Sequence, residues 1–252
     1  IRSFHDAHLV LNALRAHPRC VCIGGGLLGL ETAGAIARHG GKVTVLENFT
    51  HLMPRQLSPR AGELLKNFAA GAGVNVRLQA RTKEIVGDDH VAGVLLDDGS
   101  VEPADLVIIA TGVQPNTWLA RRAGLEIHKG IAVNDHLETS IPGIYAAGDA
   151  AEHRGTLYGS WYAAQYQGSI AGLNAAGQPT QFGGIPRSHT LKVLGLGMTS
   201  IGLINPGDSS GKVFEDESGG NYRRFVFQDN KLAGCILLGD TTGAAQLGKI
   251  IE

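Results

Sequence analysis

The sequence predicts an α/β fold of the doubly wound type, and three features support this prediction. The apolar segment Val21–Ile23 reads as a strand that leads into the glycine pattern G-x-G-x-x-G at residues 24–29 and then into a helix. A second strand, Val43–Leu46, ends in the carboxylate of Glu47. The apolar run Asp105–Ala110 is typical of a buried parallel strand. Strands and helices that alternate along the chain form a parallel sheet covered by helices.

The glycine pattern has the order that a dinucleotide-binding βαβ unit requires. Gly24 permits the tight turn off the strand, Gly26 lets a pyrophosphate approach the backbone, and Gly29 lets the helix pack close to the sheet. The helix N-terminus offers unpaired N–H groups to the phosphates. The alternative is an ordinary strand–turn–helix without a ligand. The candidate cofactor-binding residues of this turn are Gly24, Gly25, Gly26, Leu27, Leu28 and Gly29.

Glu47 indicates which dinucleotide the turn would bind. A carboxylate at the end of the second strand accepts hydrogen bonds from the hydroxyl groups of an adenosine ribose. The same carboxylate repels a 2′-phosphate, and the residues that follow, Asn48-Phe49-Thr50, include no arginine to bind one. The sequence therefore favours NADH over NADPH.

The composition limits the function classes that need to be considered. The 252 residues contain 22 Lys and Arg against 23 Asp and Glu, a formal net charge of −1, so no electrostatic argument favours nucleic acid or an anionic membrane. Cys20, Cys22 and Cys235 match neither a redox C-x-x-C pair nor a zinc site, so we expect no metal and three buried thiols in a reducing cytoplasm. No signal peptide or membrane-spanning run is evident, and the start at Ile1 suggests a piece of a longer protein.

Before the last third of the chain, helices and strands alternate. Apolar spacing predicts a helix over Asp6–Arg15, and Ser58 before Pro59 is typical of a helix start. Asp97-Asp98-Gly99-Ser100 is a hairpin turn signal. Further strands are expected at Val74–Leu78, Val91–Leu96, Ile131–Val133 and Ile144–Ala147, and further helices at Thr117–Ala123 and Leu157–Ala176.

From Phe182 onward the pattern changes to β-structure. Strands are expected near Leu191–Leu194, Tyr222–Gln228 and Lys231–Leu238, separated by turn-rich stretches such as Asn205-Pro206-Gly207-Asp208. A separate, small C-terminal domain is therefore expected.

Three further phrases connect the chain to a known family. They are Ala110-Thr111-Gly112, the sequence T-S-I-P-G-I-Y-A-A-G-D-A at Thr139–Ala150, and the small-residue helix that is expected from Leu157. Together with the glycine turn, they resemble the pyridine nucleotide–disulfide oxidoreductase superfamily of flavoprotein reductases, in which an NAD-binding domain interrupts an FAD-binding domain. The resemblance implies FAD and NAD as cofactors.

The resemblance also implies a domain organisation. Residues 1–17 would be a crossover helix from the FAD-binding domain, and residues 18–112 a three-layer NAD-binding domain. Residues 113–180 would be the second segment of the FAD-binding domain, and residues 181–252 a small α+β interface domain. The family's first FAD segment carries its own G-x-G-x-x-G, and this sequence contains no second copy. We therefore expect the N-terminal FAD segment to be missing from this sequence.

Further site residues follow from the resemblance, and two of them, Asp149 and Glu31, also have a structural alternative. Gly112 matches a glycine that passes close to a cofactor. In the Gly148-Asp149 pair, Asp149 matches an acid that hydrogen-bonds the flavin ribityl chain, although it could instead cap the following segment. Glu31 matches an acid near the nicotinamide and flavin, which makes it the candidate catalytic residue. Its alternative is a solvated acid in the first turn of a helix.

The sequence of the last domain indicates which branch of the superfamily the chain resembles. No late H-P-T motif is present, and His189-Thr190-Leu191-Lys192 reads as part of a strand. The phrases L-K-V-L-G-L-G at Leu191–Gly197 and G-C-I-L-L-G-D-T at Gly234–Thr241 resemble the NADH:rubredoxin reductase, nitrite reductase and NADH oxidase branch. Several relatives form dimers through this domain, so the resemblance also allows a homodimer.

The function implied is an NADH-dependent FAD oxidoreductase. It would pass a hydride from NADH to the flavin and electrons onward to a redox protein, a nitrite-reducing domain, oxygen or a disulfide. Two alternatives stay open: a nucleotide-binding fragment without turnover, and a scaffold or sensor subunit of a larger redox assembly.

Overall fold

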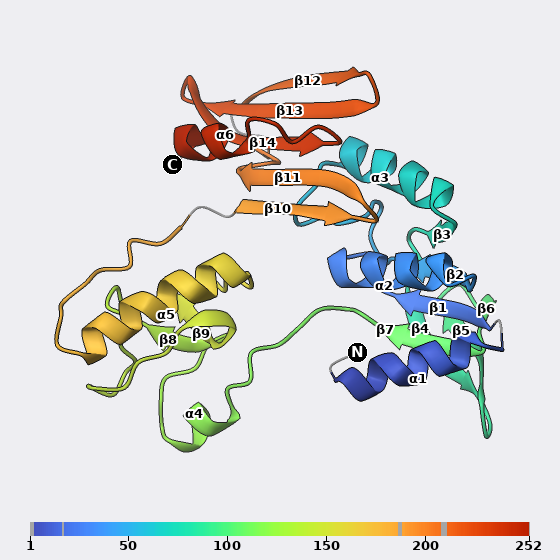
Figure 1. The fold of residues 1–252 in the computed structure, drawn as a ribbon, viewed down its shortest axis with the longest axis horizontal. Helices are drawn as coiled ribbons and strands as arrows, with labels where there is room; N and C mark the ends of the chain where they lie inside the picture. The colour runs from blue at the N-terminus through green and yellow to red at the C-terminus, as the bar shows by residue number, and fades with distance from the viewer. Residues whose placement is uncertain (1–2, 17, 186–187, 208–210, 252) are drawn as a thin grey trace. The chain divides into compact units, whose positions relative to one another are not determined.

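The computed structural model describes residues 3–16, 18–185, 188–207 and 211–251. The chain forms two compact units (Figure 1). Unit 1 contains residues 1–112 and 188–252, and unit 2 contains residues 113–187. The predicted mixed α/β fold, with parallel and antiparallel sheets, is confirmed. Within the described residues, no helix is long and apolar enough to cross a bilayer.

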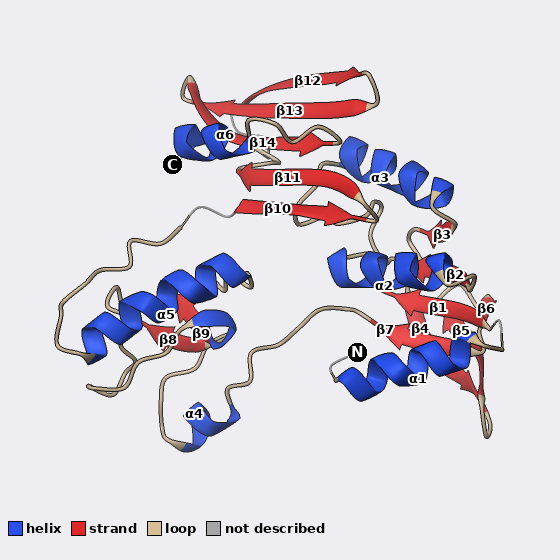
Figure 2. Cartoon of the chain, in the orientation of Figure 1, coloured by secondary structure: helices blue, strands red, loops and turns tan. Residues whose placement is uncertain are grey.

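A four-stranded parallel sheet forms the centre of the first half of unit 1. Its strands lie in the order β3-β2-β1-β7, with the first strand of the chain paired on both sides. The strands are β1 (Arg19–Ile23), β2 (Lys42–Leu46), β3 (Val74–Arg77) and β7 (Leu106–Ile109). The helices are α1 (Phe4–Leu14), α2 (Leu27–Arg38) and α3 (Pro59–Gly71) (Figure 2).

The two faces of strand β1 belong to different parts of the core. Cys20 and Cys22 lie in a cluster with buried residues of α2 and α3, such as Ile36. Val21 and Ile23 point the other way and pack against an antiparallel meander. The meander consists of β4 (Thr82–Gly87), β5 (Val91–Leu96) and β6 (Val101–Pro103). Helices, parallel sheet and meander therefore form three layers, and the expected hairpin turn joins β5 to β6.

Serine side chains begin α1 and α3. Helix α1 starts earlier than the apolar spacing predicted, because Ser3 is its N-cap and Asp6 is the third residue of a capping box. Helix α3 starts as predicted, with the Ser58 hydroxyl accepting from the N–H of Ala61 and Pro59 in the first turn.

The C-terminal part of unit 1 is a five-stranded antiparallel sheet followed by a helix. Its strand order is β10-β11-β14-β13-β12. The elements are β10 (Ser188–Val193), β11 (Leu196–Gly202), β12 (Lys212–Ser218), β13 (Asn221–Gln228), β14 (Lys231–Leu238) and α6 (Ala244–Ile251). Residues 189–192 form part of a strand, as predicted, although the side chains of His189 and Leu191 lie outside the described structure.

Apolar and polar contacts join this sheet to the helices of the first half. Leu194, Met198 and Tyr222 lie in the same core cluster as the parallel sheet. The Tyr222 hydroxyl is 2.9 Å from the Ser58 hydroxyl and donates to a Glu215 carboxylate oxygen at 2.6 Å. This bond helps to lower the pKa of Glu215, and burial raises the pKa of Tyr222.

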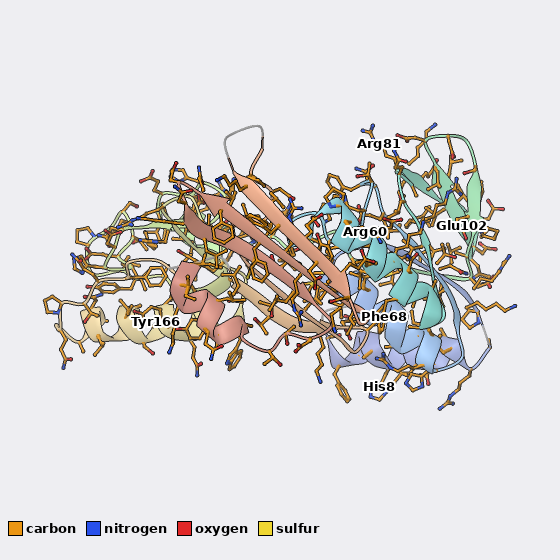
Figure 3. All side chains as sticks on the ribbon, turned by 90° about the horizontal axis from the view of Figure 1, so that it is seen from above. His8, Arg60, Phe68, Arg81, Glu102 and Tyr166 are labelled. Carbon is orange, nitrogen blue, oxygen red and sulfur yellow. The ribbon has the colours of Figure 1, made fainter. Side chains whose placement is uncertain are left out.

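An exposed ion pair forms a second polar link at the start of α3. Arg60, labelled in Figure 3, donates two hydrogen bonds at 2.8 and 2.9 Å from one guanidinium nitrogen to the carboxylate of Glu217. The same guanidinium also bonds Glu63 of its own helix. Because both partners of the link are about half exposed, it contributes less to stability than the buried Tyr222 bonds do.

Unit 2 is built around a short parallel pair and one long helix. The pair is β8 (Ile131–Val133) with β9 (Ala151–His153), and the other elements are α4 (Trp118–Arg122), the 3₁₀ turn η1 (Gly148–Ala150) and α5 (Trp161–Ala175). Phe182, Leu137 and Ile170 form its apolar core.

Two sequence predictions in unit 2 were wrong in detail. Ile144–Ala147 is not a strand, because its pairing is limited to a single bridge between Tyr145 and Glu138. The helix predicted from Leu157 begins only at Trp161. Gly159 has a positive φ of 60°, and the Ser160 hydroxyl caps the helix by accepting from the N–H of Ala163.

Replacing Tyr222 with Phe should destabilise unit 1 without changing its fold. The substitution removes the buried hydroxyl that bonds Ser58 and Glu215, and a lost buried hydrogen bond costs about 1–3 kcal/mol. Chemical denaturation gives the free energy of unfolding. The matched control is Tyr166→Phe, because the Tyr166 hydroxyl makes no hydrogen bond with the described residues. Equal stabilities for the two variants would contradict the prediction.

Candidate functional site

The glycine turn is packed so closely that side chains are excluded at two of its positions. Gly24 continues the sheet, with its N–H donating to the Leu46 carbonyl at 2.8 Å, and its φ is 112°. A Cβ atom here would clash with the Ala110 carbonyl at the end of β7. A Cβ atom on Gly29 would clash with the Gly24 carbonyl. These two glycines bring the start of α2 against the sheet, as the sequence predicted.

Gly26 differs because the space beside it is open. A Cβ atom at this position would meet nothing within 4 Å. Gly26 is also the N-cap of α2, which has no side-chain cap, and the first intrahelical bond runs from Leu30 N–H to the Gly26 carbonyl. Helices α1, α3 and α5 instead begin at capping serines. The start of α2 thus combines free backbone N–H groups with open space, the arrangement that suits a phosphate group.

The Glu47 carboxylate is tied to the turn that it borders. Its side chain is buried, at 6% exposure. One oxygen accepts from Gly25 N–H at 2.7 Å, and the other accepts from Phe49 N–H at 2.9 Å. A carboxylate has about four acceptor positions, so further hydrogen bonds to a ligand hydroxyl remain available. The end of β2 and the glycine turn are therefore held in one geometry.

The loop after Glu47 folds back over the turn, a contact that no sequence pattern indicates. Met53 N–H donates to the Gly25 carbonyl at 3.2 Å, and the Leu52 side chain occupies the space where a Cβ of Gly25 would lie. Phe49 lies in this loop with 56% of its side chain exposed, although its carbonyl accepts from Gln79 N–H at 3.0 Å. An exposed ring on a fixed backbone thus lies beside Glu47.

Two arginines, one at the end of β3 and one just after it, are engaged by carboxylates. Arg77 bonds Asp98 at 2.8 Å and lies 3.7 Å from a Glu102 oxygen. Arg81, labelled with Glu102 in Figure 3, pairs with Asp97 at 3.2 Å. These pairs reduce the positive charge that the two guanidinium groups would offer a 2′-phosphate.

Glu31 lies in α2 and connects to the C-terminal sheet. One carboxylate oxygen accepts from Leu194 N–H at 2.7 Å, across the turn between β10 and β11. Leu194 has a positive φ of 56°, and its side chain fills the space beside Gly34. The second carboxylate oxygen accepts no hydrogen bond from the described residues. Glu31 is therefore a half-buried, anchored carboxylate, which distinguishes it from a solvated acid in a first helical turn.

The predicted flavin-side residues lie in unit 2, apart from Gly112, which ends the first segment of unit 1. Gly112 has a φ of 126° and Gly148 a φ of 78°, conformations that favour glycine at both positions. Asp149 is exposed and has no hydrogen bond or ion pair with the described residues. Gly148 N–H donates to Gln167 Oε1 at 2.8 Å. Gln167 is a neighbour of this turn that sequence reasoning missed.

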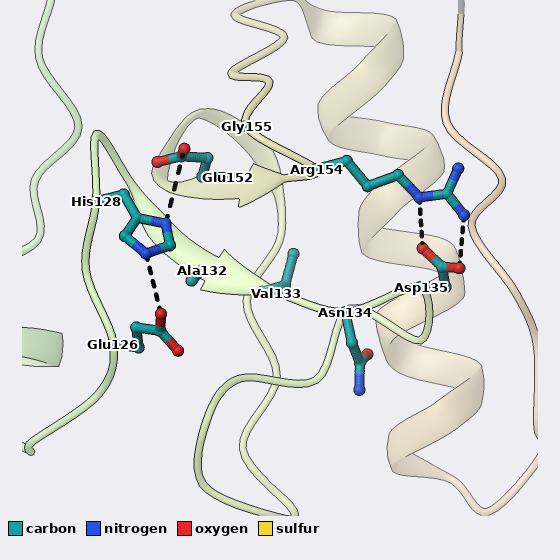
Figure 4. Close-up of a pocket in the computed structure, with 9 residues that line it drawn as sticks. All are labelled: Glu126, His128, Ala132, Val133, Asn134, Asp135, Glu152, Arg154 and Gly155. Atoms are coloured by element: carbon teal, nitrogen blue, oxygen red, sulfur yellow. Dashed lines mark hydrogen bonds and ion pairs between the residues drawn. The ribbon is translucent and has the colours of Figure 1, made fainter.

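A polar pocket of about 330 Å³ lies in unit 2 (Figure 4). Its charged groups already bind one another. Arg154 and His153 bond the Asp135 carboxylate and lower its pKa to about 2, and His128 lies 2.9 Å from Glu126. None of the predicted site residues lines it. No cluster of metal-binding side chains was found among the described residues.

The three cysteines are free and buried, as the sequence predicted. Burial raises the pKa of the Cys22 thiol to about 12, that of Cys235 to about 11, and that of Cys20 above its usual value. Cys22 lies beneath the glycine turn, with its sulfur 3.4 Å from the Gly29 carbonyl. These thiols support packing rather than nucleophilic chemistry.

Comparison with known proteins places two family patterns on the chain. Residues 1–168 match the family described as pyridine nucleotide-disulphide oxidoreductase. Residues 188–252 match the rubredoxin NAD+ reductase C-terminal domain. Together the two matches account for both units except residues 169–187.

Individual relatives agree with these matches. The chain is 38% identical to a nitrite reductase [NAD(P)H] of Bacillus subtilis. The match covers 100% of this chain and 31% of that protein. It is 32% identical to an NADH-rubredoxin oxidoreductase of Clostridium acetobutylicum, covering 99% of this chain and 62% of that one. An FAD-dependent pyridine nucleotide-disulphide oxidoreductase from Desulfovibrio vulgaris is 28% identical, with a TM-score of 0.83 over 99% of this chain and 67% of its own. The chain thus spans about a third of the first relative and under two thirds of the second.

All three thiols should resist modification in the folded protein. At about pH 8, a thiol with a strongly raised pKa is almost entirely protonated and reacts slowly. We expect Cys20, Cys22 and Cys235 to remain unlabelled by an aromatic disulfide reagent until denaturant is added, and then to react together. Absorbance of the released thiolate measures the reaction. A native thiol that reacts as fast as free glutathione would show that burial is incomplete.

Proposed function

The chain belongs to the pyridine nucleotide-disulphide oxidoreductase family, and from that premise we propose that it is the NADH-binding and partial flavin-binding portion of an oxidoreductase. Members of this family are FAD-dependent NAD(P)H oxidoreductases. One observation carries the proposal. An open space beside Gly26, free of any side chain, adjoins a helix start without a side-chain cap and lies next to an anchored carboxylate.

The residues of the glycine turn fit the diphosphate of NADH. The N–H groups at the start of α2 bind the phosphate oxygens, and Gly26 leaves room for them. Glu47 accepts hydrogen bonds from the ribose hydroxyls, because Gly25 and Phe49 already orient its carboxylate. The exposed ring of Phe49 then offers an apolar face to the adenine. Pairing of Arg77 and Arg81 with carboxylates supports NADH over NADPH.

The Gly148–Asp149 turn fits part of an FAD site. Asp149 has a free carboxylate for the ribityl hydroxyl groups. The positive φ of Gly148 sets the direction in which the backbone enters Asp149. Gln167, whose amide oxygen holds this turn, has a buried amide nitrogen without a partner among the described residues. The chemistry that bound FAD would supply here is the acceptance of a hydride from NADH and the transfer of its electrons to a second acceptor.

Glu31 is the residue of this chain that we assign to the nicotinamide end of NADH. Its bond to Leu194 fixes one carboxylate oxygen and leaves the other for a ligand. Such a group orients the reactants, and orientation is the main contribution that a protein makes to hydride transfer between two cofactors.

We assign the NADH-binding and FAD-binding roles to different segments of the chain. We assign residues 1–17 to a crossover helix, 18–112 to NADH binding, 113–180 to a segment of the FAD-binding domain and 181–252 to an interface domain. The unit boundary after residue 112 supports the limit between the second and third segments, and the family match over residues 188–252 supports a separate C-terminal segment. The three reduced thiols accord with a cytoplasmic location.

The acceptor of the electrons defines two candidate functions. Similarity to nitrite reductase and to NADH-rubredoxin oxidoreductase supports a redox protein or a nitrite-reducing domain as the acceptor. An NADH-binding portion without turnover of its own is the second candidate, favoured by the small share of the nitrite reductase that the chain spans. Calorimetric titration distinguishes the two, because the second candidate binds NADH without holding FAD.

Anaerobic addition of NADH should bleach the flavin absorbance of the protein expressed at its natural length. The expectation follows from a dinucleotide site in unit 1 and a flavin-binding turn in unit 2. The measurement is a stopped-flow absorbance trace in the visible range. Flavin that remains oxidised at saturating NADH would reject the proposed oxidoreductase function.

Replacing Glu47 with Arg should reverse the cofactor preference. The change removes the ribose acceptor, frees two backbone N–H groups and adds a cation for the 2′-phosphate. A hydrogen bond to a charged group is worth about 1.5–3 kcal/mol, so NADH affinity should fall roughly 10- to 100-fold while NADPH affinity rises.

The matched control is Glu47→Gln, which keeps one oxygen acceptor and adds no cation. It should weaken NADH binding less and give no gain for NADPH. Dissociation constants for both nucleotides come from calorimetric titration. An unchanged preference in Glu47→Arg would show that this carboxylate does not contact the ribose.

A further inference from the structure

Gln167 is a fully buried residue whose hydrogen bonds are only half made. Its side chain is 0% exposed on helix α5. Oε1 accepts from Gly148 N–H at 2.8 Å, whereas Nε2 has no partner among the described residues. Leaving a buried donor unpaired is unfavourable, and an apolar side chain at this position would avoid that cost. Packing alone therefore does not explain why a glutamine occupies position 167.

The hydrogen bond from Gly148 to Gln167 explains the glutamine, because it holds the backbone at the point where the chain changes direction. The segment before Gly148 is extended, Gly148 has a positive φ of 78°, and η1 begins there. Helix α5 also approaches the turn directly, since a Cβ on Gly148 would lie 3.4 Å from Ala164 Cβ. The helix thus holds the turn from one side by contact and by one hydrogen bond, one residue before the free carboxylate of Asp149.

We propose that Gln167 is a positioning residue of the flavin site, which holds the Gly148–Asp149 turn in the shape that directs Asp149 to the ribityl chain. The inference rests on the proposed function, and it adds a residue that neither the glycine turn nor the family phrases indicate. Gln167 acts through Gly148 and does not itself touch the flavin. Its loss should therefore change how tightly FAD is held more than it changes the stability of unit 2.

The test compares Gln167→Met with Asn174→Met in the protein expressed at its natural length. Methionine has a similar volume to glutamine and removes the acceptor for Gly148. Asn174 lies two turns further along α5, and its side chain makes three hydrogen bonds, to His136 and Thr180, away from the turn. Gln167→Met should raise the dissociation constant of FAD about tenfold or more and change the visible circular dichroism of the bound flavin. Asn174→Met should lower thermal stability and leave FAD affinity within about twofold of wild type.

The outcomes separate the inference from the function on which it rests. A wild-type protein that holds no FAD would overturn the proposed function and this inference together. A wild-type protein that holds FAD, with Gln167→Met equally tight, would overturn the inference alone. If Gln167→Met does not fold, Gly148→Ala strains the same turn from the other side, and unchanged FAD affinity there would also overturn it. NADH affinity, which depends on unit 1, should be the same in all of these variants.

Discussion

The structure of unit 1 depends on the contact between the glycine turn and the ends of its neighbouring strands. Gly29 can approach the Gly24 carbonyl, and Gly24 can approach Ala110, only because neither glycine has a Cβ atom. Glu47 then joins the end of β2 to the same turn through Gly25 N–H. One buried carboxylate and two missing side chains therefore bring three strand ends and a helix start together. Gly24, Gly25 and Gly29 are closely packed, whereas the space beside Gly26 stays open.

The elements of unit 1 could largely be predicted from the sequence because their signals are local. Ser58 with Pro59 marks a helix start, and the apolar runs around β1, β2 and β7 mark buried strands. Contacts between distant segments could not be predicted in this way. The bond from Leu194 to Glu31 joins residues 163 positions apart, and no periodicity indicates it. The same holds for Gln167, whose place in a helix with small residues on many sides gives no sign of its bond to Gly148.

Unit 2 shows a different limit of sequence reasoning. Ile144–Ala147 has the composition of a strand, yet a strand also needs a neighbour that pairs along its length, and the described residues provide one bridge. Asp149 follows that segment, and its carboxylate has no partner among the described residues, whereas charged side chains that line the pocket of unit 2 pair with one another. Unit 2 thus contains both an unpaired carboxylate and a cluster of paired charges. Whether each charge has a partner, rather than its position in a motif, distinguishes the two.

The order in which the chain is connected has a consequence for synthesis on the ribosome. The polypeptide leaves unit 1 after residue 112 and returns at residue 188, so the five-stranded antiparallel sheet is made after the parallel sheet and after unit 2. Until Leu194 and Tyr222 have been translated, the surfaces of α2 and α3 that they cover stay open to water. Exposed apolar surface of this kind attracts chaperones and encourages aggregation. A chain released before the antiparallel sheet is made would therefore keep these surfaces of α2 and α3 exposed to water.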